Sequence, residues 1–352
     1  MVSAMKPLLV AGALLASVST GAASAPARHR VIFDTDFVMP PADDGLALIL
    51  ALRSPELEIL GVTTVAGNES MEKATVDALR LLEIAGRPEI PVYKGADMPL
   101  LHEKSDFATR VHGRWWSDEP PAPPPGGFAR KKPEPQRAVD FIVRTVMARP
   151  GEVSVLAIGP LTNIAMALRQ EPGLAEGIKE IVIMGGAVAT LPDGAGNITP
   201  NAEFNFWVDP EAAKAVLRSG IPRIVLSPLN VSRKTALTKE WYEKMVAVET
   251  PITGLIRQTV GPRFAEDPGR RMLMYDQVAV ASLIDPTLVT TAELYVDVDA
   301  HPGINYGVSV GGDEPWPGAE RARKVVVQHG LDWKRFIQLF VERVTRSSPT
   351  GR

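Results

Sequence analysis

Short apolar runs alternate with longer segments of helical periodicity along most of the chain. The runs predict strands at residues 31–33, 57–65, 91–94, 153–158, 181–184, 224–226, 293–298 and 324–328. The periodic segments predict helices at residues 43–50, 71–85, 136–148, 209–218, 239–248, 251–260, 275–284 and 332–344, and one more that ends near residue 169. Because the strands are apolar throughout, they predict a mostly parallel sheet with helices on both faces.

The alternation has no internal repeat and no compositional break, so we predict a single α/β domain over residues 28–347 with an open, Rossmann-like sheet. The 352 residues are 45% hydrophobic, which suffices for one large core. Residues 97–135 interrupt the pattern with a run of prolines that regular structure excludes. We interpret this segment as an irregular insertion or a lid loop.

Residues 1–25 have the organisation of a secretory signal peptide. Lys6 supplies a positive start, residues 8–18 are apolar, and residues 19–27 are rich in small side chains. Cleavage is predicted after one of three alanines, Ala23, Ala25 or Ala27. The apolar run is too short for an ordinary transmembrane helix, and an uncleaved anchor is the alternative. We therefore expect a periplasmic or secreted protein without a stable membrane anchor.

Composition narrows the range of functions. The net charge is −3 and the basic residues are spread along the chain, which argues against a nucleic-acid partner. The chain has no cysteine, so disulfides, zinc–thiolate sites and a cysteine nucleophile are excluded.

Four carboxylates occur within eleven residues after the first predicted strand. Asp34 and Asp36 follow the strand, and Asp43 and Asp44 open the next helix. Acids so close together repel one another unless they are protonated or bridged by a cation. Helix capping by Asp43 and a turn built by the first two acids is the alternative, but it leaves part of the cluster unexplained. We predict a site for a hard divalent ion, with Ca²⁺ the best match to oxygen ligands.

Further polar motifs follow in a fixed order along the chain. They are residues 63–68 (Thr-Thr-Val-Ala-Gly-Asn), 158–163 (Ile-Gly-Pro-Leu-Thr-Asn), 184–186 (Met-Gly-Gly), Asn197, 202–205 (Ala-Glu-Phe-Asn) and 275–276 (Tyr-Asp). With the Asp cluster, this set resembles the nucleoside hydrolase family of the inosine-uridine preferring type. An Asp-x-Asp motif alone is shared with phosphatases, whereas the ordered set covers nearly the whole mature chain.

The resemblance implies an open α/β sheet with Ca²⁺ at its carboxyl edge, and it assigns roles to particular residues. Asp36 is implied as metal ligand and general base, with Asp44, Asp276 and the Ile158 carbonyl as further ligands, and Asp34 is expected to be structural. The implied catalytic residues are Asp36, Asp276 and Glu203. The implied ribose contacts are Asp43, Asn68, Met184, Asn197, Glu203 and Asn205. Taken singly, several of these residues also suit turns or helix caps.

Two positions depart from the family pattern. Six residues, 37–42, separate Asp36 from the acid pair, where members with a short loop have three. Tyr275 stands where well-known members carry a histidine that assists the departing base, and a phenol is a weak acid near neutrality. Three residues of the long loop are candidate base contacts, His112, Trp115 and Trp116. Ordinary packing of that loop is the alternative.

The leading hypothesis is an exported Ca²⁺-dependent hydrolase that cleaves ribonucleosides to free base and ribose, as purine or pyrimidine salvage requires. The resemblance also implies a homo-oligomer, a dimer or tetramer. A second hypothesis, motivated by Tyr275, is a nucleoside- or ribose-binding protein with little or no turnover. An Asp-x-Asp phosphohydrolase using Mg²⁺ is a third, but the expected lysine and second acidic motif are absent. Base preference is left open.

Overall fold

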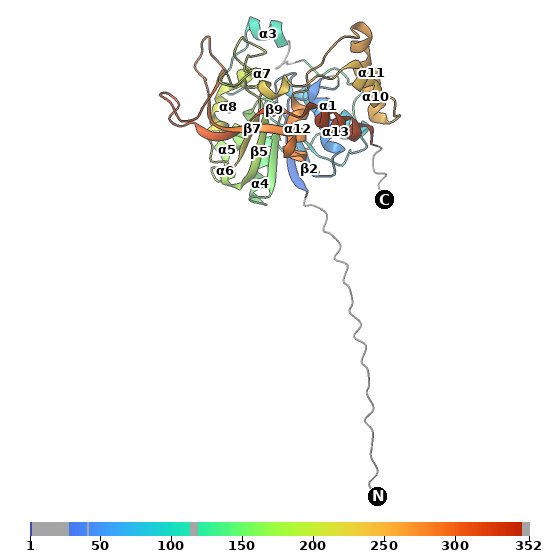
Figure 1. The fold of residues 1–352 in the computed structure, drawn as a ribbon, viewed down its shortest axis with the longest axis horizontal. Helices are drawn as coiled ribbons and strands as arrows, with labels where there is room; N and C mark the ends of the chain where they lie inside the picture. Colours follow the sequence, from blue (N-terminus) through green and yellow to red (C-terminus); the bar gives the residue numbers. More distant parts are fainter. Residues whose placement is uncertain (2–27, 41, 113–118, 347–352) are drawn as a thin grey trace.

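A nine-stranded sheet forms the centre of the molecule (Figure 1). The computed structural model describes residues 1, 28–40, 42–112 and 119–346. The strand order is β3-β2-β1-β4-β5-β6-β9-β7-β8, and only β7 runs against the others. The strands are β1 (His29–Thr35), β2 (Leu57–Thr64), β3 (Val92–Lys94), β4 (Val153–Ala157), β5 (Ile178–Met184), β6 (Ile224–Ser227), β7 (Val289–Val298), β8 (Ser309–Gly312) and β9 (Arg323–Leu331).

Helices cover both faces of the sheet, because neighbouring strand residues point to opposite sides. In β1, Val31 and Phe33 join one hydrophobic cluster and Ile32 joins the other. The first cluster includes side chains of α1 (Asp43–Leu52), α2 (Met71–Ile84), α10 (Lys239–Val246), α11 (Pro251–Glu266), α12 (Asp276–Ile284) and α13 (Trp333–Thr345). The second includes those of α4 (Ala138–Met147), α5 (Thr162–Gln170), α6 (Leu174–Gly177) and α8 (Pro210–Leu217).

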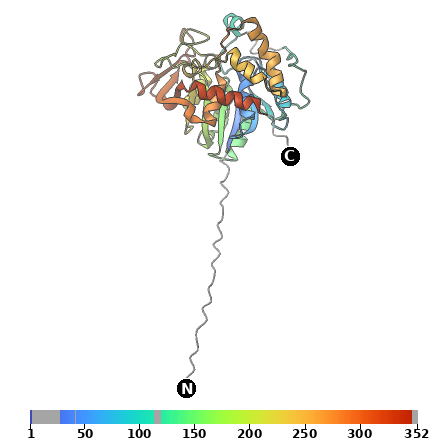
Figure 2. The same cartoon turned by 45° about the vertical axis from the view of Figure 1, so that its right-hand side comes forward.

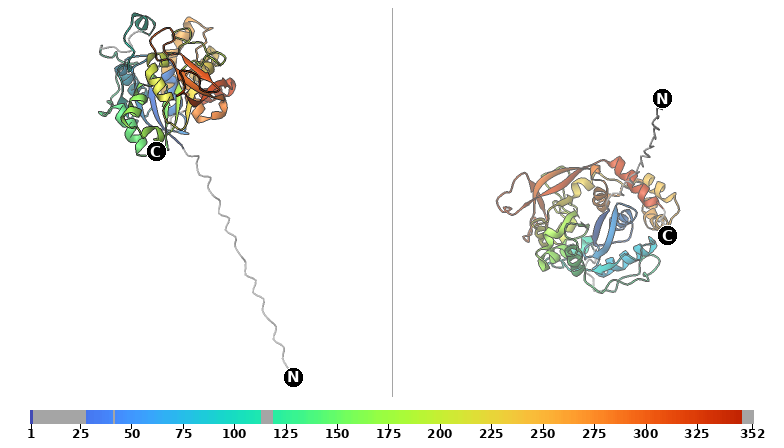
Figure 3. Two further views of the ribbon diagram at one scale, coloured as in Figure 1. Left: turned by 90° about the vertical axis from the view of Figure 1, so that its left-hand side faces the viewer. Right: turned by 90° about the horizontal axis from the view of Figure 1, so that it is seen from below.

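Two further views show these layers. Helix α13, in red, lies across one side of the sheet in Figure 2. Seen from below in Figure 3, the blue first strands lie between this helix and the green helices of the opposite side. The predicted α/β architecture with a covered, mostly parallel sheet is therefore confirmed.

Several elements differ from the prediction. Strand β8 was not predicted, because its two glycines hide a strand that forms by pairing with β7. Helix α11 continues past its predicted end and through Pro262 to Glu266. The continuation buries Phe264, whose ring lies 5.3 Å from that of Tyr242. Four short elements were also missed. They are α6, α7 (Phe204–Val208), α9 (Leu229–Ser232) and the 3-10 turn η1 (Pro286–Leu288).

The segment predicted to be irregular contains one helix, α3 (Asp106–His112), at the top of Figure 1. The residues that lead into α3 contact the body of the protein at two points. The Leu100 N–H donates to Asp209 at 2.9 Å, and the His102 ring packs edge-on against Trp207. The described part of this segment is therefore attached to the helices that follow β5.

Candidate active site

Asp36 lies beyond the carboxyl end of β1, between two neighbouring loops. Its side chain is fully buried, and Oδ2 accepts a hydrogen bond from the Asn68 N–H at 2.7 Å. The other oxygen, Oδ1, is buried and has no hydrogen-bond partner among the described residues. A Cβ built at Gly67 would lie 2.1 Å from Oδ2, and one at Gly159 would lie 2.9 Å from Oδ1. Both loops therefore need glycine to approach this carboxylate.

The segment that separates Asp36 from α1 packs into the core. Phe37 and Met39 are buried in the same cluster as α1 and α2. The Met39 N–H donates a hydrogen bond to Asp77 of α2, which is also paired with Lys73 at 2.5 Å. The described residues between Asp36 and α1, which exclude residue 41, thus form a turn that Phe37 and Met39 anchor in the core.

Asp44 is held by two donors in the first turn of α1. Thr35 Oγ1 donates to its Oδ1 at 2.6 Å, and Asn68 Nδ2 donates to its Oδ2 at 3.0 Å. The N-cap of α1 is Ala42, which makes no side-chain capping bond, so Asp43 follows the cap. Helix capping therefore does not account for this acid pair.

Asp276, the first residue of α12, completes a compact acidic cluster. Oxygens of Asp43, Asp44 and Asp276 all lie within 4.8 Å of one another. Asp36 lies beside them, since it interacts directly with Asp44. The predicted metal ligands include Asp36, Asp44 and Asp276 but not Asp43. The geometry thus adds Asp43 to the cluster as a fourth acid.

The donors fit a hard divalent cation. They are carboxylate oxygens, the ligand type that such ions prefer, and Asp36 Oδ1 is otherwise an orphaned buried acceptor. The Ile158 carbonyl, the predicted main-chain ligand, accepts a hydrogen bond from Asn205 Nδ2 at 3.0 Å. This atom therefore faces Asn205 just beyond the carboxyl end of β4.

The electrostatics of the cluster favour a bound positive charge. Desolvation, reinforced by Asp44, raises the pKa of Asp43 to about 7, and desolvation raises the pKa of Asp44 to about 6. Desolvation, followed by the neighbouring carboxylates, raises the pKa values of Asp36 and Asp276 well above the ordinary value. Without a cation the cluster thus retains protons that isolated acids would lose.

Asp34 has a different environment from the other acids. Its Oδ2 accepts hydrogen bonds from the Thr63 hydroxyl and from Asn163 Nδ2, the latter at 2.8 Å. Asn163 also accepts from the Ala96 N–H, so the three residues join the ends of β1, β2 and α5. Burial raises the pKa of Asp34 to about 6. These contacts agree with the structural role expected for it.

Glu203 and Asn205 lie at the start of α7. Glu203 is the N-cap and accepts from the N–H groups of Gly186, Asn205 and Phe206. Burial raises the Glu203 pKa although these donors lower it. Asn205 Nδ2 donates to the carbonyls of Ile158 and Met184, which join the ends of β4 and β5. The structure thus brings these residues together at the same edge as the acids.

The other residues predicted to contact ribose or base differ in burial and in hydrogen bonding. Asn68 uses its amide on Asp44, and Asn197 is exposed with its Oδ1 accepting from the Phe204 N–H at 2.9 Å. Tyr275 is half-buried, and burial and then Asp43 raise its pKa to about 12. The backbone of His112 ends α3, while its side chain, with Trp115 and Trp116, falls outside the described residues.

Sequence reasoning missed one cation near this edge. Arg233, just after α9, donates three hydrogen bonds to the carbonyls of Asp193, Ala195 and Gly196. Asp193 has a left-handed backbone, with φ of 62°, and pairs with Lys234. The Arg-Lys pair thus fastens the loop that presents Asn197. No sequence motif marks this basic pair, so its position in the sequence gave no signal.

Among the described residues, none of the helices has the length and apolar character needed to cross a membrane.

Comparison with known proteins agrees with the geometry. The family model of the inosine-uridine preferring nucleoside hydrolase matches residues 31–338. Uncharacterized protein C1683.06c of Schizosaccharomyces pombe is 36% identical over 90% of this chain and 99% of its own length. Pyrimidine-specific ribonucleoside hydrolase RihB of Escherichia coli is 33% identical over 87% of this chain and 94% of its own.

A solved structure supports the same conclusion. The plant nucleoside hydrolase PpNRh1 superposes with a TM-score of 0.76 at 30% identity, covering 91% of this chain and 99% of that chain. Sequence, fold and the cluster of acids beyond β1 thus converge on one assignment. The chain belongs to the inosine-uridine preferring nucleoside hydrolase family, whose members hydrolyse the N-glycosidic bond of ribonucleosides.

Proposed function

We propose that this nucleoside hydrolase depends on Ca²⁺ held by Asp36, Asp44, Asp276 and the Ile158 carbonyl, and that it is exported. The observation that carries the calcium proposal is the acid cluster, in which oxygens of Asp43, Asp44 and Asp276 lie within 4.8 Å of one another. Asp36 lies beside them and has one buried oxygen without a hydrogen-bond partner among the described residues. Such a cluster is stable at neutral pH only when its charge is compensated.

Each side chain of the site has a separate role in the proposed reaction. When bound, the ion would neutralise the acids and lower the pKa of water in the site. Asp36 takes the proton of the attacking water, because its carboxylate lies beside the other acids of the cluster. Asp43 accepts hydrogen bonds from the ribose hydroxyls. Cleavage of the glycosidic bond builds positive charge on the sugar, which the Glu203 carboxylate stabilises.

Removal of the ion is expected to abolish base release. We expect a purified, chelator-treated protein to lose more than about 100-fold of its activity on inosine and uridine, since metal and general base act together. Added Ca²⁺ should restore activity, and absorbance of the released base measures it. Full turnover by protein shown to be metal-free by elemental analysis would exclude the calcium proposal.

Tyr275 is expected to contribute little to leaving-group departure. With its pKa raised to about 12, the phenol donates a hydrogen bond but is a poor acid. Tyr275→Phe should therefore lower kcat/KM by no more than about tenfold, the effect of one hydrogen bond. A loss of a thousandfold or more, measured by steady-state kinetics, would show that the phenol is the acid.

The binding-protein alternative rests on the same residue, because a site without an effective acid holds nucleoside better than it cleaves it. Calorimetric binding of uridine with no base released after long incubation would favour this alternative. Release of base from any of inosine, adenosine, guanosine or uridine would favour the hydrolase. The similarity to RihB, named for pyrimidine specificity, makes uridine the first substrate to test.

Export and assembly rest on the sequence. The apolar run and small residues before residue 28 support removal of a signal peptide. N-terminal sequencing of protein recovered outside the cytoplasm should give a sequence that begins after Ala23, Ala25 or Ala27.

Light scattering of the purified protein should give the mass of a dimer or tetramer.

A further inference from the structure

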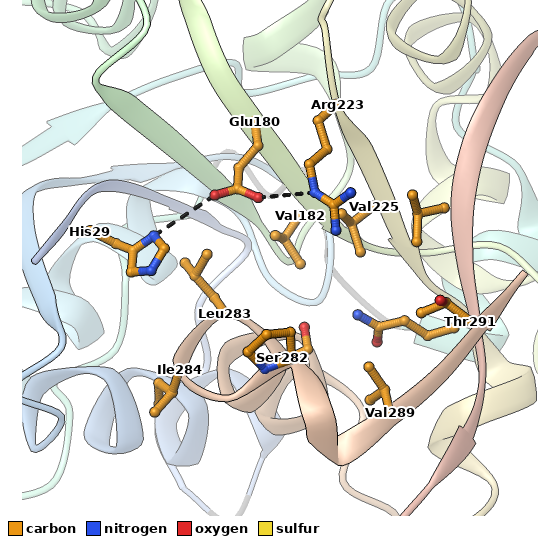
Figure 4. Close-up of a pocket in the computed structure, with 13 residues that line it drawn as sticks. His29, Glu180, Val182, Arg223, Val225, Ser282, Leu283, Ile284, Val289 and Thr291 are labelled. Atoms are coloured by element: carbon orange, nitrogen blue, oxygen red, sulfur yellow. Dashed lines mark ion pairs between the residues drawn. The ribbon is translucent and has the colours of Figure 1, made fainter. Parts of the chain in front are cut away.

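A second pocket lies on the α12 side of the sheet, away from the acid cluster (Figure 4). Its volume is about 250 Å³. His29 begins β1 and Arg223 precedes β6, so the pocket reaches the amino ends of the parallel strands. The acids follow the carboxyl ends. The two sites are therefore at opposite ends of the sheet.

One buried amide in this pocket lacks a hydrogen-bond partner. Gln328 of β9 lines the pocket and is 1% exposed, and its Oε1 is unpartnered among the described residues. Leaving such a group unsatisfied costs about 1–3 kcal/mol. A ligand that donates to this oxygen would remove the penalty.

The other lining residues describe the ligand. Figure 4 shows Glu180 between His29 and Arg223, at 3.8 Å and 3.4 Å, so the charges at the rim are largely compensated. Val182 and Leu283 give the interior apolar walls. The volume falls below the roughly 300–1,000 Å³ typical of drug-sized ligands. A small, neutral, ring-shaped molecule with a polar edge fits these features.

We propose that this pocket binds a free nucleobase through the Gln328 amide, which rests on the hydrolysis described above because that reaction releases the base. A glutamine amide presents a donor beside an acceptor and pairs bidentately with a base edge, as it does with adenine in DNA. The apolar walls accommodate the ring faces. The occupant is the product of the enzyme rather than its substrate, since the volume leaves little room for ribose.

The pocket and the acid cluster share one helix, α12. Helix α12 begins at Asp276 in the acid cluster, and its last residues, Ser282 to Ile284, line the pocket. Nine residues span about 13 Å at 1.5 Å each. A base bound at one end of this buried helix therefore contacts the element that carries an acid at the other end.

Calorimetric titration of the mature protein with uracil, cytosine, adenine and hypoxanthine tests the proposal. Asp44→Ala disables the acid cluster, and we expect base binding to persist in this variant. In the same background, Gln328→Leu should weaken the binding at least about tenfold, as the loss of two hydrogen bonds predicts. Because it removes an unsatisfied amide, the leucine variant should fold at least as stably. The matched control is Gln170→Leu, on the exposed side of α5.

A second variant tests whether the base binds in the pocket itself, rather than at a place that the Gln328 substitution affects indirectly. Thr291→Trp fills the pocket from its exposed rim, leaves the amide in place and should abolish the same binding. Unchanged affinity in both variants, or no binding of any of the four bases at millimolar concentration, would overturn the proposal. Because binding is measured without turnover, failure of hydrolysis would not be mistaken for failure of this site.

Discussion

Asp36→Asn is expected to lower kcat for uridine about 10³-fold while the protein remains folded. Asparagine keeps the size of the side chain and an oxygen that accepts from the Asn68 N–H, but it cannot take a proton from water. Steady-state kinetics at saturating Ca²⁺ measures the loss. Asp44→Asn should instead act on the ion, raising the Ca²⁺ concentration needed for half-maximal activity.

Asp34→Asn is the matched control for this experiment. Asp34 is equally buried and stands two residues earlier, but its accepting oxygen contacts only Thr63 and Asn163. An amide oxygen can accept the same bonds, so kcat should fall by less than about tenfold. Equal losses in the Asp34 and Asp36 variants would show that the proposed division between structural and catalytic acids is wrong.

Gly67→Ala is expected to weaken Ca²⁺ binding about 10–100-fold although it replaces no charged residue. Its Cβ would lie 2.1 Å from Asp36 Oδ2 and 2.7 Å from Asp36 Cγ, so the carboxylate must move. Displacing a group that orients a ligand costs affinity of this order. Calorimetric titration with Ca²⁺ measures the change.

Gly254→Ala provides the comparison, since a Cβ at this position in α11 meets no atom within 4 Å. It should leave Ca²⁺ affinity unchanged and slightly stabilise the helix. If Gly67→Ala binds Ca²⁺ as tightly as Gly254→Ala does, the loop adapts without displacing Asp36. The close contact between Gly67 and Asp36 would then not matter for Ca²⁺ binding.

Much of the sheet could be predicted because its strands are buried on both faces. A run such as residues 31–33 has no polar interruption, so a strand is the simplest interpretation. Strand β8 lacks that signal, because its glycines pack against Val188 and Trp316 rather than forming an apolar run. Pairing with β7, which no local pattern encodes, makes it a strand.

The acidic edge was predictable in position but not in detail. The order of Asp34, Asp36, Asp43 and Asp44 along the chain placed four acids beyond β1. Their division depends on partners far away in sequence. Asn163 donates to Asp34, whereas Asn68, which is expected to hold ribose, donates to Asp36 and Asp44.

The turn before α1 illustrates the same limit. The spacing showed only that this segment is longer than in short-loop members of the family. Burial of Phe37 and Met39, and the bond from the Met39 N–H to Asp77, depend on helix α2 being in place. Such contacts join residues about forty positions apart, beyond the reach of local periodicity.

The position of β9 has a consequence for how the chain folds during synthesis. This last strand lies inside the sheet, between β6 and β7, and not at an edge. The hairpin of β7 and β8 therefore has no neighbouring strand to pair with until residues 323–331 have been made. Pairing of that half therefore waits until β9 has been made, so a chain that stops before β9 would leave the β7–β8 hairpin without its partner strand.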